Sequence, residues 1–173
     1  MKCNYNRRII IGLLFGNNVL LAIGRRGSPR KLNVPGEDSS KVAYRLLEPE
    51  RISNKKIIVV GGGDSAIESA LLLKDENKVI LSYRKDQFSR LKPKNREKIN
   101  EAIEDRSIEV LYNSNLVSIN EKDVLIKFGA DETTQNIEND LVYIFAGGEL
   151  PTGFLQKAGV EISKRFGYIL KKH

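Results

Sequence analysis

The sequence is poor in the residue types that most often form disulfides, metal sites and acid–base centres. Its 173 residues contain one cysteine, Cys3, one histidine, His173, and no tryptophan. A single cysteine excludes a disulfide within the chain, and one cysteine with one histidine cannot form the usual four-ligand zinc site. We therefore predict a reducing, cytoplasmic setting and no metal site. We name no catalytic side chain, because His173 is the last residue and is expected to be solvated.

Long hydrophobic runs are missing as well. The apolar run Ile9–Phe15 follows three basic residues, as in a secretory signal, but Asn17 and Asn18 interrupt the apolar stretch soon after it. It is too short to span a bilayer, and no small-residue cleavage pattern follows it. We therefore predict neither a signal peptide nor a membrane partner.

The net charge of +7 is spread along the chain, with concentrations at Arg25–Lys31 and Arg84–Lys98. An excess of basic residues can indicate nucleic acid, an anionic membrane or a phosphorylated small molecule. The sequence has no arginine-rich tail and no aromatic pattern of RNA-recognition proteins, so we predict no nucleic-acid partner. A phosphorylated small molecule remains the simplest explanation.

The spacing of apolar residues predicts a series of strands and helices whose order indicates an α/β fold. We predict a Rossmann-like three-layer NAD(P)-binding domain with a β-meander. Hydrophobic residues make up 40% and charged residues 29%, as in an ordinary globular protein. The predicted strands are Arg8–Phe15, Asn17–Ile23, Lys56–Val60, Lys78–Tyr83, Ile108–Tyr112, Leu116–Asn120, Asp123–Phe128, Thr134–Glu138 and Leu141–Ala146. The predicted helices are Val42–Glu48, Asp64–Lys74, Pro93–Asp105 and Thr152–Ala158, and Gly24–Ser40 is expected to be a loop.

The stretch KIIVVGGGDSAIE, from Lys56 to Glu68, predicts a strand, a tight glycine turn and a helix. Gly61, Gly63 and Ala66 satisfy the pattern G-x-G-x-x-[G/A] of dinucleotide-binding turns. The first glycine makes the turn, the second lets a pyrophosphate approach the backbone, and the small third residue lets the helix pack closely on the strand. The pyrophosphate would then lie on the N–H groups at the helix N-terminus. A Walker-type loop is excluded because no G-K-[ST] follows, but a turn that only connects two elements stays possible.

The residues after the next predicted strand indicate which dinucleotide is bound. An acidic residue at this point binds the ribose 2′-hydroxyl of NAD, whereas an arginine accommodates the 2′-phosphate of NADP. The chain has Ser82, Tyr83, Arg84 and Lys85 here, no acidic residue before Asp86, and Arg90 further along the same loop. We therefore predict NADPH rather than NADH, with a solvated run of charges as the alternative.

Three segments together resemble the thioredoxin-reductase-like, pyridine-nucleotide-dependent flavoproteins. Val19–Glu37 resembles the signature that ends in P-G-E, Gly61–Glu68 the NADPH fingerprint, and Leu141–Leu155 the segment that returns to the flavin domain. The resemblance implies an NADPH domain inserted in an FAD domain, with hydride passing from NADPH to flavin and electrons passing on to an acceptor. It also implies the domain ranges 1–50 (part of an FAD domain), 51–148 (NAD(P)-binding) and 149–173 (return to the FAD domain).

The resemblance carries site residues with it. Glu68 falls at the nicotinamide side of the fingerprint helix, although it could also be a solvent-facing helix residue, and Gly147-Gly148 could be a simple turn. The resulting cofactor-binding residues are Gly61, Gly62, Gly63, Asp64, Ser65, Ala66, Glu68, Ser82, Tyr83, Arg84, Lys85, Arg90, Ala146, Gly147 and Gly148.

Two departures from the family pattern matter. No cysteine lies between Glu37 and Gly61, so the dithiol of thioredoxin reductase is absent. This favours dithiol-free relatives: ferredoxin–NADP reductases, bacillithiol-disulfide-reductase-like flavoproteins, or NADPH modules paired with iron–sulfur domains. The chain also lacks the first G-x-G-x-x-G and the late G-D motif for FAD. We expect a truncated product or a partner chain, either a flavin domain or a second copy, with Ile9–Ile23 as the candidate contact.

Three functions stay open at this point. The first is the NADPH-binding portion of an FAD-dependent oxidoreductase whose acceptor is a disulfide, ferredoxin or iron–sulfur protein, with little turnover from this chain alone. The second is a non-catalytic Rossmann module that senses NAD(P). The third is a short-chain dehydrogenase, which needs Y-x-x-x-K; only Tyr168 with Lys172 fits, outside the expected helix.

Overall fold

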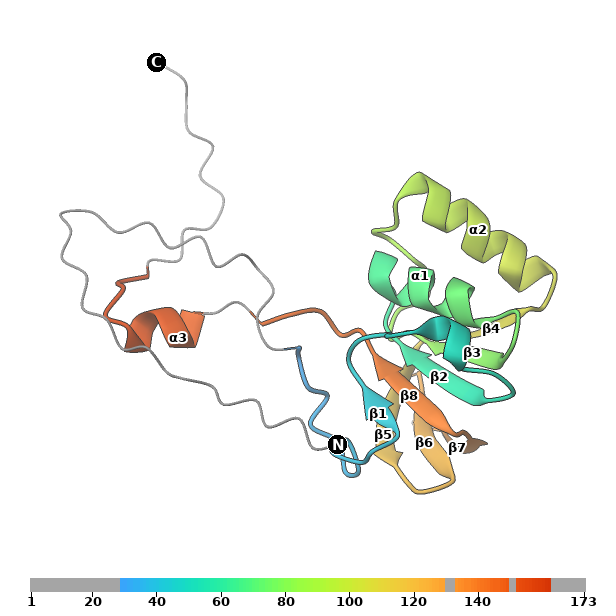
Figure 1. Ribbon diagram of the computed structural model, residues 1–173, viewed down its shortest axis with the longest axis horizontal. Coiled ribbons are helices and arrows are strands. Elements are labelled where there is room, and N and C mark those ends of the chain that lie inside the picture. Colours follow the sequence, from blue (N-terminus) through green and yellow to red (C-terminus); the bar gives the residue numbers. More distant parts are fainter. Residues whose placement is uncertain (1–28, 130–132, 150–151, 163–173) are drawn as a thin grey trace, which may run out of the picture.

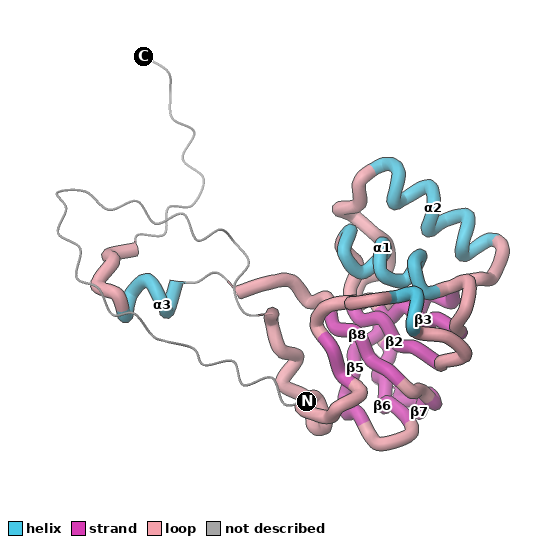
Figure 2. The backbone as a smooth tube through the Cα atoms, viewed as in Figure 1, coloured by secondary structure: helices cyan, strands magenta, loops and turns pink. Residues whose placement is uncertain are grey.

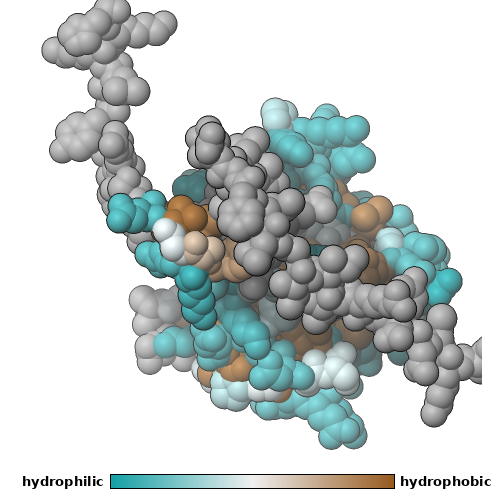
Figure 3. Space-filling model, turned by 60° about the vertical axis from the view of Figure 1, so that its left-hand side comes forward, coloured by the Kyte–Doolittle hydropathy of each residue, from teal (hydrophilic) through white to brown (hydrophobic). Residues whose placement is uncertain are grey.

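The computed structural model describes residues 29–129, 133–149 and 152–162 (Figure 1). The two predicted strands Arg8–Phe15 and Asn17–Ile23 lie outside the described residues. No described helix has the length and apolar character needed to cross a membrane. The face in Figure 3 is mainly hydrophilic over the described atoms, with smaller hydrophobic areas.

A five-stranded parallel sheet forms the middle layer of the fold. Its strand order is β1-β8-β2-β3-β4, and the core strand β2 is an apolar, β-branched run, as expected for a strand covered on both faces. Val60 pairs with Ser82 of β3 and with Ile144 of β8, so the carboxyl ends of these three strands lie level with one another. The strands are β1 (Val42–Ala43), β2 (Lys56–Val60), β3 (Lys78–Ser82), β4 (Ile108–Leu111) and β8 (Leu141–Ile144).

Helices α1 (Asp64–Leu73) and α2 (Pro93–Glu104) cover one face of this sheet (Figures 1 and 2). Apolar residues of α1 recur every three or four positions and are fully buried against β2 and β3. Pro93 occupies the first turn of α2, where its missing N–H is tolerated. Ile99 and Ala102 complete the buried face of α2.

A three-stranded antiparallel sheet covers the other face. It consists of β5 (Ser114–Ile119), β6 (Asp123–Phe128) and β7 (Thr133–Glu138), with β6 in the middle. Val124 and Ile126 of β6 are fully buried against Ile58, Val142 and Ile144 of the parallel sheet. The molecule therefore has three layers: helices, a parallel sheet and an antiparallel sheet. The predicted α/β, Rossmann-like class with a meander is confirmed.

Most predicted elements are present with ends shifted by one or two residues, including the short last helix, α3 (Thr152–Lys157). The predicted helix Val42–Glu48 is wrong. Val42 and Ala43 form β1 and pair with Val142 and Tyr143 of β8, and the following helical turn is η1 (Pro49–Arg51). The helical spacing was misleading because the open edge of β8, remote in sequence, provides backbone partners for these two residues.

Candidate functional site

The glycine turn lies at the carboxyl edge of the parallel sheet, between β2 and α1. The Gly61 N–H donates to the Ser82 carbonyl oxygen (3.0 Å). Gly61 has φ of 138°, and a Cβ there would lie 2.6 Å from the Phe145 carbonyl oxygen. A Cβ on Gly62 would lie 2.2 Å from the ring of Tyr83. The fold itself therefore requires glycine at both positions.

Gly63 differs from its two neighbours, because a Cβ at this position would meet nothing within 4 Å. The turn therefore leaves open space against the backbone, just before the N-terminus of α1. Within the described residues, no hydrogen-bond acceptor contacts the N–H groups of Gly62, Gly63, Asp64 and Ser65. These free donors and the helix dipole favour an anion here.

A cavity of about 530 Å³ opens at this edge. Gly61–Gly63 form one side of it, and the residues that follow β3 and β8 form the others. The predicted site residues that line it are Gly61, Gly62, Gly63, Ser82, Tyr83, Arg84, Lys85, Arg90, Ala146 and Gly147. The remaining five predicted residues, Asp64, Ser65, Ala66, Glu68 and Gly148, are not part of the lining.

The cationic side of the cavity is a loop between β3 and α2. Arg84, Lys85 and Arg90 are exposed on it, whereas Phe88 is buried. The Phe88 ring stacks on Tyr83 (centroids 5.2 Å apart) and contacts Tyr112 (5.4 Å). These contacts hold the loop close to the glycine turn, because Tyr83 also covers Gly62.

Ser82 lines the cavity, but its hydroxyl group is engaged within the protein. Ser114 Oγ donates to the Leu111 carbonyl oxygen (2.6 Å), which uses its only hydroxyl proton. The 2.8 Å bond between Ser82 and Ser114 therefore has Ser82 Oγ as donor. Ser82 is also fully buried, which leaves the basic side chains as the exposed polar groups that follow β3.

The model of the pyridine nucleotide-disulphide oxidoreductase family matches residues 12–171. The chain belongs to this family. The match agrees with the predicted resemblance, and a Rossmann-like layer structure with a glycine turn at the sheet edge is the fold expected of such a protein.

Individual relatives and solved structures of this family also match the chain. It is 31% identical to bacilliredoxin reductase Bdr of Bacillus subtilis over 150 residues, which cover 86% of the chain and 46% of that protein. It is 37% identical to a ferredoxin–NADP reductase of Ignicoccus hospitalis over 87 residues, 47% of the chain and 28% of that protein.

Among solved structures, bacillithiol disulfide reductase of Staphylococcus aureus matches with a TM-score of 0.75 and 26% identity, over 80% of the chain and 43% of that structure. Thioredoxin reductase of Lactococcus lactis matches with a TM-score of 0.67 and 25% identity, over 77% and 46%. The chain spans less than half the length of these relatives.

The side chains of three predicted site residues, Asp64, Ala66 and Glu68, contact other parts of the fold and not the cavity. Ala66 is fully buried and is 3.2 Å from the position of a Cβ on Gly61, so its small size lets α1 approach β2. Asp64 Oδ1 accepts hydrogen bonds from the Lys92 N–H (3.0 Å) and from Asn95 Nδ2 (2.7 Å), which together lower the pKa of the Asp64 carboxyl. Glu68 Oε1 accepts from the same Asn95 amide (2.8 Å).

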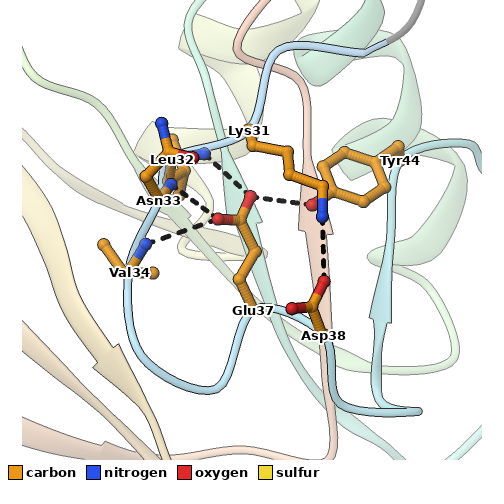
Figure 4. Close-up of polar contacts among 7 residues, drawn as sticks. All are labelled: Lys31, Leu32, Asn33, Val34, Glu37, Asp38 and Tyr44. Carbon is orange, nitrogen blue, oxygen red and sulfur yellow. Dashed lines mark hydrogen bonds and ion pairs between the residues drawn. The ribbon is translucent and has the colours of Figure 1, made fainter.

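The P-G-E segment contributes to the site in a way that the sequence did not predict. Glu37 is buried, and its carboxylate accepts hydrogen bonds from the N–H groups of Leu32 (2.7 Å), Asn33 (2.6 Å) and Val34 (3.4 Å), and from the Tyr44 hydroxyl (2.7 Å) (Figure 4). A charged side chain enclosed by four donors fixes the chain around it. The residues that Glu37 holds in this way, 32–34, are part of one wall of the cavity.

That wall is formed by residues 30–34, of which Arg30, Lys31, Leu32 and Val34 line the cavity. The Arg30 N–H donates to the Gly147 carbonyl oxygen (3.0 Å), and Pro29 bridges to Gly148. Sequence reasoning noted the basic concentration Arg25–Lys31 without assigning it to the site. The bridge to Gly147-Gly148 brings Arg30 and Lys31 of that concentration to the site. The sequence also did not predict the lining residues Ser114–Leu116, where the Ser114 N–H donates to the Tyr83 carbonyl oxygen (3.0 Å).

Proposed function

We propose that this chain is the NADPH-binding portion of an FAD-dependent oxidoreductase that passes hydride from NADPH to flavin and on to a disulfide, ferredoxin or iron–sulfur acceptor. One observation carries the proposal: a single cavity joins the open glycine turn at Gly63 to the cations Arg84, Lys85 and Arg90. A dinucleotide with a 2′-phosphate needs these two features on either side of its adenosine ribose, which carries the pyrophosphate on O5′ and the additional phosphate on O2′. Family membership supports the same reading.

The residues present fit NADPH in detail. The pyrophosphate would lie against Gly63, on the free N–H groups at the start of α1. Arg84 would offer a planar pair of donors to the 2′-phosphate, with Lys85 and Arg90 as further charges. The buried Ser82 and the half-buried Tyr83 occupy the place where an acidic residue would repel that phosphate.

When bound, NADPH supplies the hydride and FAD accepts it. The chain's own contribution is to bind and orient the dinucleotide. Ala146 and Gly147 follow β8 and line the cavity beside the glycine turn. Gly147 has φ of 91° and open space around it, so the backbone can run along a flat ligand there. These residues would guide the nicotinamide half away from the phosphate-binding loop.

The proposal extends to the complete enzyme. Residues 51–148 would be the NAD(P)-binding domain, and residues 1–50 and 149–173 would belong to the FAD domain of the complete enzyme. Part of the range 1–50 packs on residues 51–148. Strand β1 joins the parallel sheet, and Leu32 and Val34 pack against the apolar residues between the two sheets. The electron acceptor would be a separate protein or disulfide.

Replacing both Arg84 and Lys85 by alanine tests the proposal. We expect the wild-type chain to bind NADPH more tightly than NADH. The double variant should bind NADPH at least about 30-fold more weakly, since each of the two charge-assisted bonds contributes at least about 1 kcal/mol at an exposed site. NADH affinity should change less than about twofold, because NADH lacks the 2′-phosphate. Titration followed by dinucleotide fluorescence measures both affinities.

Lys98→Ala is the matched control, because Lys98 is an exposed lysine of α2 outside the cavity lining. It should bind both dinucleotides like the wild type. Equal wild-type affinity for NADPH and NADH would contradict the proposal. A further measurement separates the alternative of an NAD(P)-sensing module: adding a flavin-binding partner and FAD should start NADPH oxidation, followed at 340 nm, only if the chain belongs to a flavoenzyme.

A further inference from the structure

The loop with the basic side chains is attached to α1 by a hydrogen-bond network outside the cavity. Asp64 is the first residue of α1 and directly follows the glycine turn. Its Oδ1 atom accepts from the backbone N–H of Lys92 and from Asn95 Nδ2. Lys92 is the last residue before α2, so this network holds the far end of the loop.

Asn95 strengthens the attachment. Its side chain is buried, and its amide nitrogen donates to Asp64 Oδ1 and to Glu68 Oε1, which lie one turn apart on α1. Both amide protons are therefore used on α1. The buried amide group of Asn95 thereby links the N-terminal turns of α1 and α2, beside the bond from the Lys92 N–H.

The near end of the loop is held separately. The Tyr83 N–H donates to the Leu111 carbonyl oxygen (2.9 Å), and the Asn113 N–H donates to the Lys85 carbonyl oxygen (3.1 Å). Phe88 anchors the middle of the loop in the core. Arg90 lies between the buried residues Phe88 and Leu91, and Lys92 follows directly. The position of Arg90 relative to the glycine turn therefore depends on this packing and on the Asp64 and Asn95 network.

We propose that Asp64 and Asn95 are positioning residues that set the preference for the 2′-phosphorylated dinucleotide, by fixing the basic loop at a set distance from the glycine turn. This inference depends on the proposed function, because it assigns the 2′-phosphate to the loop and the pyrophosphate to the turn. Asp64 then acts through its side-chain acceptor atom on the loop, while its backbone N–H faces the pyrophosphate.

The test compares the NADPH and NADH affinities of the full chain in four variants: Asp64→Ala, Asn95→Ala, the double variant, and Asp64→Asn. We expect each alanine variant to lower the ratio of NADPH to NADH affinity about tenfold, the effect of one lost charge-assisted contact to phosphate. The double variant should lower the ratio by less than the product of the two single effects, because the bond between Asp64 and Asn95 is lost in both single variants. Asp64→Asn should restore the wild-type ratio, since an amide oxygen can accept the same two hydrogen bonds.

Asp75→Ala is the control, because Asp75 is an exposed carboxylate beyond the other end of α1, paired with Lys74. An equal loss of affinity for both dinucleotides, an unchanged ratio in the alanine variants, or additive effects in the double variant would overturn the inference. Failure of the proposed function gives a different result: the wild-type chain itself would then show no preference for NADPH. Thermal unfolding of each variant confirms that the affinities refer to folded protein.

Discussion

Replacing Glu37 by glutamine is expected to lower the free energy of unfolding at pH 7 by about 3 kcal/mol. The carboxylate is buried and accepts four hydrogen bonds, three from backbone N–H groups and one from Tyr44. A glutamine side chain has the same shape but directs an NH₂ donor at these donors, so at least one buried N–H group loses its partner. Hydrogen bonds to charged groups contribute about 1.5–3 kcal/mol, and an unsatisfied buried donor adds a similar cost.

The measurement is urea unfolding of the wild type and of Glu37→Gln. Asp38→Asn is the matched control, because the Asp38 side chain is 90% exposed and its partner is Lys31 on the surface (Figure 4). The control should stay within about 0.5 kcal/mol of the wild type. A Glu37→Gln variant as stable as the control would show that the carboxylate does not hold residues 32–34.

The same residue makes a defined contribution to the pH dependence. Burial raises the pKa of the Glu37 carboxyl, but the hydrogen bonds from Leu32, Tyr44, Asn33 and Val34 outweigh this effect and the net pKa is lowered from 4.5. Burial and the bond to Glu37 raise the pKa of Tyr44 to about 12, so its hydroxyl stays a donor through neutral pH.

A lowered carboxyl pKa means that the unfolded chain takes up the proton more readily than the folded one. The stabilisation is therefore complete above the unfolded pKa and is lost as the pH falls through the lowered folded pKa. We expect the difference in unfolding free energy between wild type and Glu37→Gln to be constant from pH 6 to 8 and to shrink below about pH 4.5. A difference that stays constant down to pH 3 would contradict this assignment.

Replacing Gly63 by alanine is expected to remove dinucleotide binding while leaving the fold intact. The new methyl group would enter open space, since nothing lies within 4 Å, and the φ of −99° is accessible to alanine. The unfolding free energy should fall by no more than about 1 kcal/mol, the usual cost of alanine at a helix N-cap. The methyl group would occupy the space where the pyrophosphate approaches the backbone, so NADPH and NADH affinity should both fall at least about 100-fold.

Gly62→Ala provides the contrasting variant. Its Cβ would lie 2.2 Å from the Tyr83 ring, which cannot move freely because it stacks on Phe88. We expect this variant to lose about 2 kcal/mol of stability through overpacking. Thermal unfolding and fluorescence titration of both variants separate the two effects. Wild-type affinity in Gly63→Ala would mean that no pyrophosphate lies against this turn.

Local patterns in the sequence were sufficient for much of the site. The run Lys56–Val60, the glycines and the apolar spacing of α1 predicted the strand, the turn and the helix, with only the helix end shifted by one residue, because each depends on residues close together in the chain. The same holds for the position of Arg84 and Lys85, since a parallel strand that pairs with β2 must end at the same edge of the sheet.

Contacts between distant segments were beyond this reasoning. The segment Val42–Glu48 has helical spacing, yet Val42 and Ala43 form a strand because β8, about a hundred residues later, offers an open edge. Glu37 is a local case: its donors Leu32, Asn33, Val34 and Tyr44 are close in the chain, but no sequence pattern indicated that they enclose its carboxylate. The side chain of Asp64 turns to Lys92 and Asn95, a choice that depends on where α2 begins.

The amino-acid sequence by itself determined the three-layer α/β class, the glycine turn between β2 and α1 and the basic residues after β3. Hydrophobic periodicity and the backbone freedom of glycine depend on residues close together in the chain. The tertiary structure alone decided that residues 30–34 close the cavity, that Glu37 holds them, and that Asp64 and Asn95 fix the basic loop. The physical reason is that a polar side chain satisfies its hydrogen bonds with whichever donors and acceptors the fold brings within about 3 Å. For Asp64 these donors are the Lys92 N–H and the Asn95 amide, which belong to a segment far from Asp64 in the chain.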